Sequence, residues 1–542
     1  MNTPGDLSND STVAPSLPSW RVTLGLLALI LLAATLRARH MSEPLWVDEL
    51  HTAWVVEGSL ADVADRAAVG NQGPLFFYAQ WFLCSLLTPS ELTYRCLSLV
   101  AGLLLVPTVF FVAREICGSD WAGWTAAAMI SVDRFSVIFS CEARPYAWVQ
   151  WVTVVHLYLG WLRLTASYQL ASKPSPRLRL AWIGSGALLF YLHYTAALIL
   201  CAEVVAWVVL RLRYRGLARP DRSLGTIDLV GLAVVCSPAL PHLMMINHRR
   251  TNWTEFVPMP TILSLLTLLP LLVYVGLPLA ARLTESVTGK EVSRNRGRAV
   301  WLTMLCCCLL FPLLVTWVTT VSGMAALYLT RYLIGSLTVS VLIAATLLGR
   351  LQGDGRRWVT AIVLAVVVLL TESAISFSRW VPANGAWPPF LHRSGVRAKQ
   401  EDWRSLISHV NEQDPAGRWP VFLVPDLIED RQLGQSQAPP LHARISREEF
   451  CLFPLQGCYP LRRSRVPPVA LASKPAVLQD QHLDCLKMAR GGWFIVRGSR
   501  SRVQGWQQAI DKALAGDGPG PRSELQRFGS LGLVRVQSLP IQ

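Results

Sequence analysis

Residues 46–54 read Trp-Val-Asp-Glu-Leu-His-Thr-Ala-Trp and follow the first long apolar segment of the chain. Residues 140–146 read Ser-Cys-Glu-Ala-Arg-Pro-Tyr and separate two later apolar segments. A carboxylate beside a segment hydrophobic enough to enter a bilayer is costly unless it is paired, hydrated or used in chemistry. If both motifs lie on one side of a membrane, their side chains can form a single site.

The composition is that of a multi-pass membrane protein. The 542 residues are 52% hydrophobic and 16% charged, which is too apolar for a mostly soluble chain. Residues 1–19 are polar and rich in Ser and Pro, and we expect them to be disordered. We further expect an all-α polytopic transmembrane domain at 20–378 and a soluble C-terminal α/β domain at 379–542.

The apolar runs predict about eleven membrane-spanning helices. The first, at 20–36, lacks a convincing small-residue cleavage site, so we expect an uncleaved helix rather than a signal peptide. The run at 74–87 is too short to cross, and we expect it to lie along the interface or re-enter the membrane. The other spans are expected near 93–113, 121–139, 146–165, 180–193, 195–211, 226–246, 261–281, 299–320, 326–349 and 358–378.

The basic residues predict the orientation of these spans. The formal net charge of +15 does not indicate nucleic-acid binding, because Arg and Lys are spread over short loops and concentrate in alternate ones, such as 211–222 and 282–298. This bias predicts a cytoplasmic N-terminus and an extracytoplasmic C-terminal domain, and it outweighs the opposite local signal of Arg37 and Arg39. Both motifs then lie on the outer face, within a first outer loop at 37–92 and at residues 140–146, together with His193, Tyr194 and Arg331.

The C-terminal segment alternates strand-like runs with helix-like ones. Runs at 421–424, 493–496 and 531–536 are typical of buried strands, and those at 403–410 and 504–514 are typical of helices. The segment contains no nucleotide-binding fingerprint.

The cysteines indicate no metal site. Most of the twelve lie inside apolar spans, where Cys acts as a small hydrophobe, and none forms a CxxC pair. Cys451 and Cys458 could form a disulfide if the C-terminal domain is extracytoplasmic, which would leave Cys485 unpaired.

Each motif has a structural interpretation beside a functional one. Asp48 could cap a helix that contains 52–56, and Glu142 could pair with Arg144 to fix a turn. In the functional interpretation a carboxylate of the first motif deprotonates a hydroxyl group. Glu142 then holds a cation or a sugar hydroxyl, and Arg144 binds a phosphate through two N–H groups.

The outer ends of two later spans offer similar alternatives. His193 and Tyr194 form a very short outer turn, where a lone His is more often a helix-end residue than a ligand. Arg331 begins a span, where it could reach lipid phosphate or hold the phosphate of a lipid-linked substrate.

The order of these parts resembles the GT-C superfamily of integral-membrane glycosyltransferases. The resemblance rests on the acidic pair Asp48-Glu49, the Gln-Gly-Pro-Leu-Phe-Phe-Tyr element at 72–78 and the motif at 140–146, and it covers roughly residues 20–378. The bacterial branch related to protein O-mannosyltransferases, aminoarabinose transferases and rhizobial lipopolysaccharide-core transferases is the most similar. The expected fold is therefore GT-C-like, with an added extracytoplasmic α/β domain.

The resemblance also implies an activity. Such enzymes move a sugar from a polyprenyl-phosphate donor to a hydroxyl of a cell-envelope glycan, lipid or protein, usually with inversion, at the outer face of the bacterial inner membrane. By resemblance, Asp48 is the base, Glu49 is its neighbour in the site and Glu142 is the second acid. The substrate-binding candidates are Arg144, Tyr146, His193, Tyr194, Arg331 and Gln72.

The chain departs from the family pattern at two points. The related element usually reads His-Pro-Pro-Leu-Tyr-Tyr, whereas Gln72 and Gly73 stand here, so no role of that His is carried over. The second motif has one acid rather than an Asp-x-Asp pair, so no cofactor is established by sequence and a divalent cation stays an open alternative.

Two other classes of function remain as alternatives, a transporter or flippase of lipid-linked glycans and a non-catalytic membrane scaffold. Transporters place ionisable or helix-breaking residues near the bilayer midplane, whereas the singled-out residues here gather at one face. This placement favours surface chemistry over transport.

Overall fold

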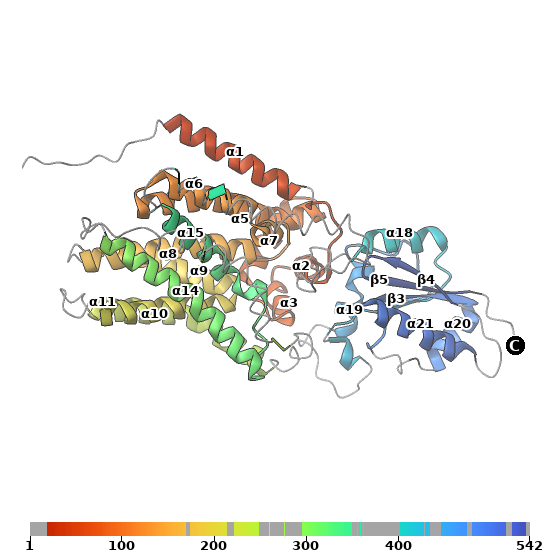
Figure 1. The fold of residues 1–542 in the computed structure, drawn as a ribbon. Coiled ribbons are helices and arrows are strands. Elements are labelled where there is room, and N and C mark those ends of the chain that lie inside the picture. Colours follow the sequence, from red (N-terminus) through yellow and green to blue (C-terminus); the bar gives the residue numbers. More distant parts are fainter. Residues whose placement is uncertain are drawn as a thin grey trace, which may run out of the picture.

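The computed structural model of this chain has a helical part and a C-terminal part built on a β-sheet (Figure 1). The residues that it describes are 19–38, 40–169, 174–213, 222–248, 259–260, 276, 295–349, 355, 358, 361–362, 401–427, 429–433, 446–473, 478, 480–515 and 523–537.

The first half of the helical part contains the helices of the outer loop and the first apolar helices. They are α1 (Ser19–Ala38), α2 (Val47–Glu57), α3 (Val63–Val69), α4 (Leu75–Leu86), α5 (Glu91–Cys117), α6 (Asp120–Val132), α7 (Arg134–Ser140) and α8 (Tyr146–Gln169).

The second half of the helical part contains six described α-helices and three short 3-10 turns. They are α9 (Pro176–Leu192), η1 (Tyr194–Ala196), α10 (Ala197–Arg213), α11 (Arg222–Cys236), η2 (Ser237–Ala239), α12 (Leu240–His248), α14 (Asn295–Val321), η5 (Thr330–Leu333) and α15 (Ile334–Leu348).

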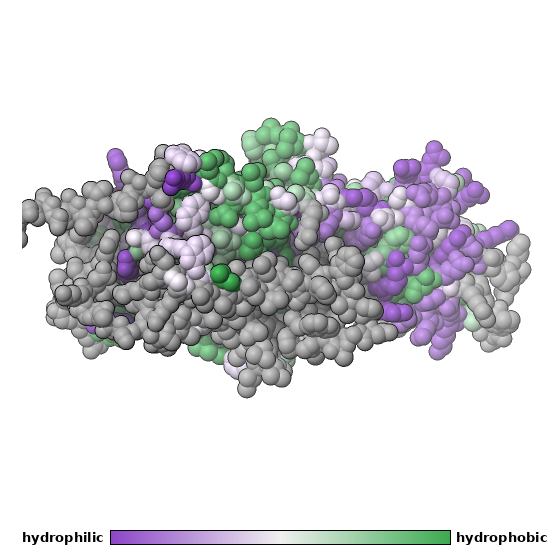
Figure 2. All heavy atoms as spheres, turned by 45° about the horizontal axis from the view of Figure 1, so that its top comes forward, coloured by the Kyte–Doolittle hydropathy of each residue, from purple (hydrophilic) through white to green (hydrophobic). Residues whose placement is uncertain are grey.

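The helical part is that of a multi-pass membrane protein. Among the described residues, six helices are long and apolar enough to cross a membrane: Trp20–Ala38, Glu91–Cys117, Tyr194–Arg213, Gly225–Asn247, Gly297–Val321 and Thr330–Leu348. Hydrophobic residues gather over this part and hydrophilic residues over the C-terminal part (Figure 2). The spans expected at 261–281 and 358–378 lie almost wholly outside the described residues, as do residues 1–18 and the domain boundary near 379, so the total of about eleven spans stays a prediction.

Local sequence signals explain how the helices begin and end. The Ser90 hydroxyl caps α5 by accepting the N–H of Thr93, and α5 ends at Gly118, whose φ of 58° is left-handed. The span expected at 121–139 is broken at Asp133, whose carboxylate accepts the N–H of Ser136 at 2.8 Å and starts α7.

The outer loop folds as three short helices. The apolar run at 74–87 forms α4, which has 12 residues and is too short to span a bilayer as a helix. The residues before it form α3. In Figure 1, α2 and α3 lie at the end of the helical part that faces the C-terminal domain.

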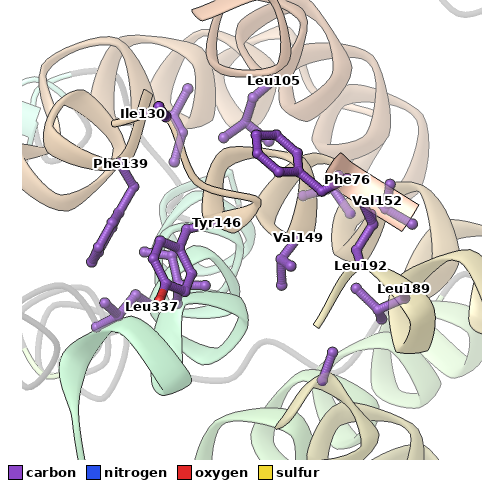
Figure 3. Packing of buried hydrophobic residues seen from close by; sticks show 14 of the residues in the cluster. Phe76, Leu105, Ile130, Phe139, Tyr146, Val149, Val152, Leu189, Leu192 and Leu337 are labelled. Carbon is purple, nitrogen blue, oxygen red and sulfur yellow. The ribbon is translucent and has the colours of Figure 1, made fainter. Parts of the chain in front are cut away.

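The interior of the helical part is packed by side chains from several helices. Tyr146 and Val149 of α8 point into this packing, with Leu337 of α15 close to Tyr146 (Figure 3). The ring of Tyr146 also packs edge-on against Phe139 of α7, with ring centroids 5.0 Å apart.

The C-terminal part is a mixed five-stranded sheet with the order β2-β1-β3-β5-β4. Strand β1 pairs in parallel with β2 and β3, and β5 pairs antiparallel with β3 and β4. The predicted strands and helices of this segment are confirmed. The elements are α18 (Trp403–Gln413), β1 (Val421–Val424), η7 (Glu429–Gln432), α19 (Arg447–Gln456), β2 (Val469–Ala470), α20 (Asp480–Ala489), β3 (Gly491–Arg497), α21 (Arg500–Ala515), β4 (Ser523–Phe528) and β5 (Leu531–Gln537). Cys451 and Cys458 are unbridged thiols in this structure.

The C-terminal domain is tied to the outer loop by a buried carboxylate. Glu401 accepts hydrogen bonds from the Val47 backbone N–H at 3.0 Å and from the Arg497 guanidinium at 2.6 Å. It also accepts a hydrogen bond from the Trp403 indole at 2.9 Å. Glu401 therefore joins the N-terminus of α2 to the sheet domain.

Replacing Glu401 with Gln should loosen this junction. The change leaves the largely buried Arg497 without its counter-charge, which is expected to cost about 3 kcal/mol of stability. The measurement is a thermal melt of the detergent-solubilised protein followed by tryptophan fluorescence. Glu412→Gln, on the exposed face of α18, is the matched control and should melt like the wild type; equal melts for both variants would contradict the role of Glu401.

Candidate active site

A cavity of about 200 Å³ lies where the outer ends of the helical part meet the C-terminal domain. Its walls come from α2, the turn at 70–73, η1, α12, the segment 325–332 and parts of the C-terminal domain. Six of the nine predicted site residues line it, namely Asp48, Gln72, Arg144, His193, Tyr194 and Arg331.

Asp48 and Arg331 form an ion pair at the wall of the cavity. Their Oδ2 and Nη1 atoms are 2.6 Å apart, and each side chain is 25% exposed. The helix-capping interpretation of Asp48 is wrong, because α2 begins at Val47 with Trp46 as its N-cap residue. Asp48 is therefore a carboxylate in the first turn of α2 that faces a guanidinium in the cavity.

Glu49 has a different environment from Asp48. Its carboxylate is 1% exposed and binds Arg95 in a two-pronged ion pair, with N···O distances of 2.7 and 2.6 Å. It also accepts the backbone N–H of Ala143 at 2.9 Å and that of Trp46 at 3.3 Å. Glu49 is not among the described residues that line the cavity. Its carboxylate is engaged in holding segments of the chain together.

The two sequence motifs meet at Ala143. Its N–H is bound by Glu49, and its carbonyl accepts a hydrogen bond from the Thr52 hydroxyl at 2.7 Å. The next residue, Arg144, donates from Nη1 to the Asp48 carbonyl at 3.1 Å. The structure thus brings the acidic pair and the second motif together. This is the arrangement expected if both motifs lie on one side of the membrane.

Glu142 and Tyr146 lie close behind the cavity wall. Both are buried, and neither is among the described residues that line this cavity. The ring of Tyr146 packs against His193, with centroids 5.4 Å apart. Tyr332 packs against His193 at the same separation, so the imidazole contacts two phenol rings.

The turn at 70–73 shapes another wall of the cavity. Asn71 has a left-handed φ of 56°, and Gln72 is buried. A Cβ added at Gly73 would come within 2.6 Å of the Tyr191 carbonyl oxygen, so a larger residue would push the turn away from α9. This close approach favours glycine at position 73.

The sequence interpretation missed residues that complete the cavity. His51 lies one helical turn after Asp48 and lines the cavity. Their i, i+3 spacing places both residues on one face of the helix, and this spacing could have identified His51 from the sequence. Leu427, Glu429 and Phe450 line it from the C-terminal domain. No local pattern indicates them, because their position depends on how the two parts of the chain pack.

His51 is an uncharged member of this site. Burial, with a further contribution from the nearby Arg144 guanidinium, lowers the pKa of His51 to about 3. It is therefore expected to be neutral at physiological pH, and among the described residues that line the cavity the positive charges are those of Arg144 and Arg331. Within the described residues, no group of three or more His, Cys, Asp or Glu side chains is placed to hold a metal ion.

Comparison with known proteins identifies the fold. No known protein family matches the sequence, and no curated protein is significantly similar to it. Among solved structures, ArnT from Cupriavidus metallidurans bound to undecaprenyl phosphate is 12% identical with a TM-score of 0.52, covering 96% of this chain and 98% of that chain. The apo state of the same protein is 12% identical with a TM-score of 0.54, covering 95% and 98%. The chain therefore has the GT-C membrane fold, as its sequence predicted.

Replacing Glu49 with Gln should destabilise the whole outer face. Arg95 is 3% exposed in its ion pair with Glu49, and a buried guanidinium without its partner is expected to cost about 3–5 kcal/mol. Thermal melting in lipid nanodiscs measures the effect. Glu43→Gln, whose carboxylate is 49% exposed, is the control and should change stability by less than about 0.5 kcal/mol. A Glu49→Gln protein as stable as the control would show that the pair is dispensable.

Proposed function

We propose that this chain is a membrane glycosyltransferase that moves a sugar from a polyprenyl-phosphate donor to a hydroxyl of a cell-envelope acceptor, with inversion. The observation that carries the proposal is the cavity in which the Asp48 carboxylate faces Arg331, with Arg144 in the same wall. A base for the acceptor and cations for the departing phosphate are the groups that this reaction needs.

The fold supports the choice of donor. The chain shares its fold with ArnT, which has been solved bound to undecaprenyl phosphate. One side of the cavity is apolar, with Leu243 and Ile246 from α12 and Leu327 and Leu329 from the segment before η5. An isoprenoid chain can follow such a side while its phosphate reaches the two arginines.

The charge pairing suggests an order of events. Arg331 balances the charge of Asp48 across the 2.6 Å ion pair, in which each side chain is 25% exposed. A donor phosphate near Arg331 competes with Asp48 for the guanidinium. The carboxylate then becomes available to accept the proton of an incoming hydroxyl.

The transfer step conserves atoms and charge. The acceptor oxygen attacks the anomeric carbon from the face opposite the phosphate, and its proton passes to the Asp48 carboxylate. The bond between the anomeric carbon and the phosphate oxygen breaks, and its electron pair stays on the polyprenyl phosphate. Arg144 and Arg331 stabilise the negative charge that develops there.

The other acids take supporting roles in this proposal. Glu49 holds the Ala143 backbone, and Glu142 lies buried beside it, so both act on the shape and potential of the site rather than by touching the reacting atoms. In this proposal the protein lies in the bacterial inner membrane, with the cavity and the C-terminal domain on the outer side. Acceptors then approach past Leu427, Glu429 and Phe450, which line the cavity.

The test is donor turnover by purified protein in lipid vesicles. Polyprenyl-phosphate sugars of several kinds are offered with water or glycans as acceptors, and mass spectrometry follows the release of polyprenyl phosphate. Asp48→Asn should lower turnover by about 10²- to 10⁴-fold, the range for loss of a general base. Asp484→Asn, at an exposed position on α20, should keep the wild-type rate.

Two results would decide against the assignment. Turnover by Asp48→Asn equal to that of the wild type would remove Asp48 as the base. Movement of intact donor across the bilayer without cleavage would support the flippase alternative instead.

A further inference from the structure

His51 lies in a tightly built position at the wall of the cavity. Its ring contacts Phe77 and Phe450 edge-on, with centroids 5.8 and 5.9 Å apart. On another side lies Gly70, where an added Cβ would come within 2.5 Å of the imidazole Cε1 atom. The surrounding residues therefore hold the ring in one place and leave little room for it to turn.

The contacts of His51 define its tautomer. Nε2 lies 3.2 Å from the Arg66 carbonyl oxygen, which can only accept, so Nε2 carries the proton. Nδ1 lies 3.4 Å from Arg144 Nη1, which can only donate, so Nδ1 presents its lone pair. The low pKa of this buried histidine agrees with a neutral ring. His51 thus links a fixed backbone carbonyl to the guanidinium of Arg144.

A second acceptor on α2 also holds the guanidinium of Arg144. Nη1 also donates to the Asp48 carbonyl at 3.1 Å, and Nε is buried without a hydrogen-bond partner among the described residues. Two acceptors on α2, the Asp48 carbonyl and His51 Nδ1, therefore set the direction in which Arg144 points.

The C-terminal domain also contributes to the surroundings of His51. Phe450 of α19 packs on His51 and, at 4.8 Å between centroids, on Trp54. The neighbouring Glu449 approaches Arg66 Nη2 at 3.4 Å, and Arg66 Nη1 donates to the Trp54 carbonyl at 2.6 Å. Helix α19 thus contacts both the ring of His51 and the residue whose carbonyl fixes it.

We propose that His51 is a positioning residue for Arg144, and that docking of Phe450 from the C-terminal domain is required for Arg144 to bind the phosphate of a polyprenyl phosphate. The inference rests on the proposed function, because it takes Arg144 as a phosphate ligand. It adds that the anion site is complete only when the sheet domain is docked on α2.

The experiment measures binding of undecaprenyl phosphate to full-length protein in nanodiscs, with undecaprenol as the comparison ligand. His51→Phe keeps a packed ring but removes the lone pair that faces Arg144. It should weaken undecaprenyl phosphate binding about tenfold and leave undecaprenol binding unchanged. His51→Asn keeps an acceptor near the Nδ1 position and should recover most of the loss. A purely structural role would lower the affinity for both ligands together.

A double-mutant cycle tests the contribution of the C-terminal domain. Phe450→Leu alone should weaken undecaprenyl phosphate binding several-fold. Combined with His51→Phe it should add little, because both changes act through Arg144. Glu448→Gln, at an exposed position of α19 away from Arg66, is the control and should bind like the wild type.

The outcomes separate this inference from the proposed function. The inference would be overturned if His51→Phe bound undecaprenyl phosphate with wild-type affinity, or if the effects of the two changes were fully additive. Donor turnover by the wild type would still support the transferase assignment in that case. Binding that depends on His51 without any turnover of a glycosyl donor would keep the inference and sink the transferase. A wild-type protein that binds no undecaprenyl phosphate would overturn both.

Discussion

The buried ion pair between Glu49 and Arg95 is the interaction on which the outer face of this protein depends. Arg95 also donates to the carbonyls of residues 40, 41, 43 and 44, so it holds the chain as it leaves α1. Glu49 in turn binds the N–H of Ala143. One pair of charges therefore fixes the chain after the first membrane helix, the start of α2 and the turn before α8 in a single arrangement.

This constraint explains why two adjacent acids have different environments. Successive residues of an α-helix point in directions about 100° apart. When Glu49 is turned into the protein to meet Arg95, Asp48 is turned toward the cavity, where it meets Arg331. The hydrogen bond from the Ala143 N–H to Glu49 also fixes the position of the next residue, Arg144. The residues that could take part in chemistry are thus positioned by neighbours that stay buried.

Simple physical patterns in the sequence predicted the membrane helices and the C-terminal α/β domain, and six of the nine candidate site residues line one cavity. Apolar length and basic loops placed Asp48, Arg144 and Arg331 at one face, and hydrophobic runs gave the strands of the C-terminal domain. The partner of Glu49 was not predictable, because Arg95 lies at the start of an apolar helix and nothing local indicates which acid it meets. Phe450 was missed because its contact with His51 depends on packing between distant parts of the chain.

The most direct test of this account is an experimental structure of the protein with undecaprenyl phosphate bound. The account predicts that the phosphate lies within hydrogen-bond distance of both Arg144 and Arg331, with the isoprenoid chain passing along α12. It also predicts that Arg331 is then shared between Asp48 and the phosphate. A phosphate bound away from both arginines, with the pair between Asp48 and Arg331 unchanged, would contradict the assignment of this cavity as the site of glycosyl transfer.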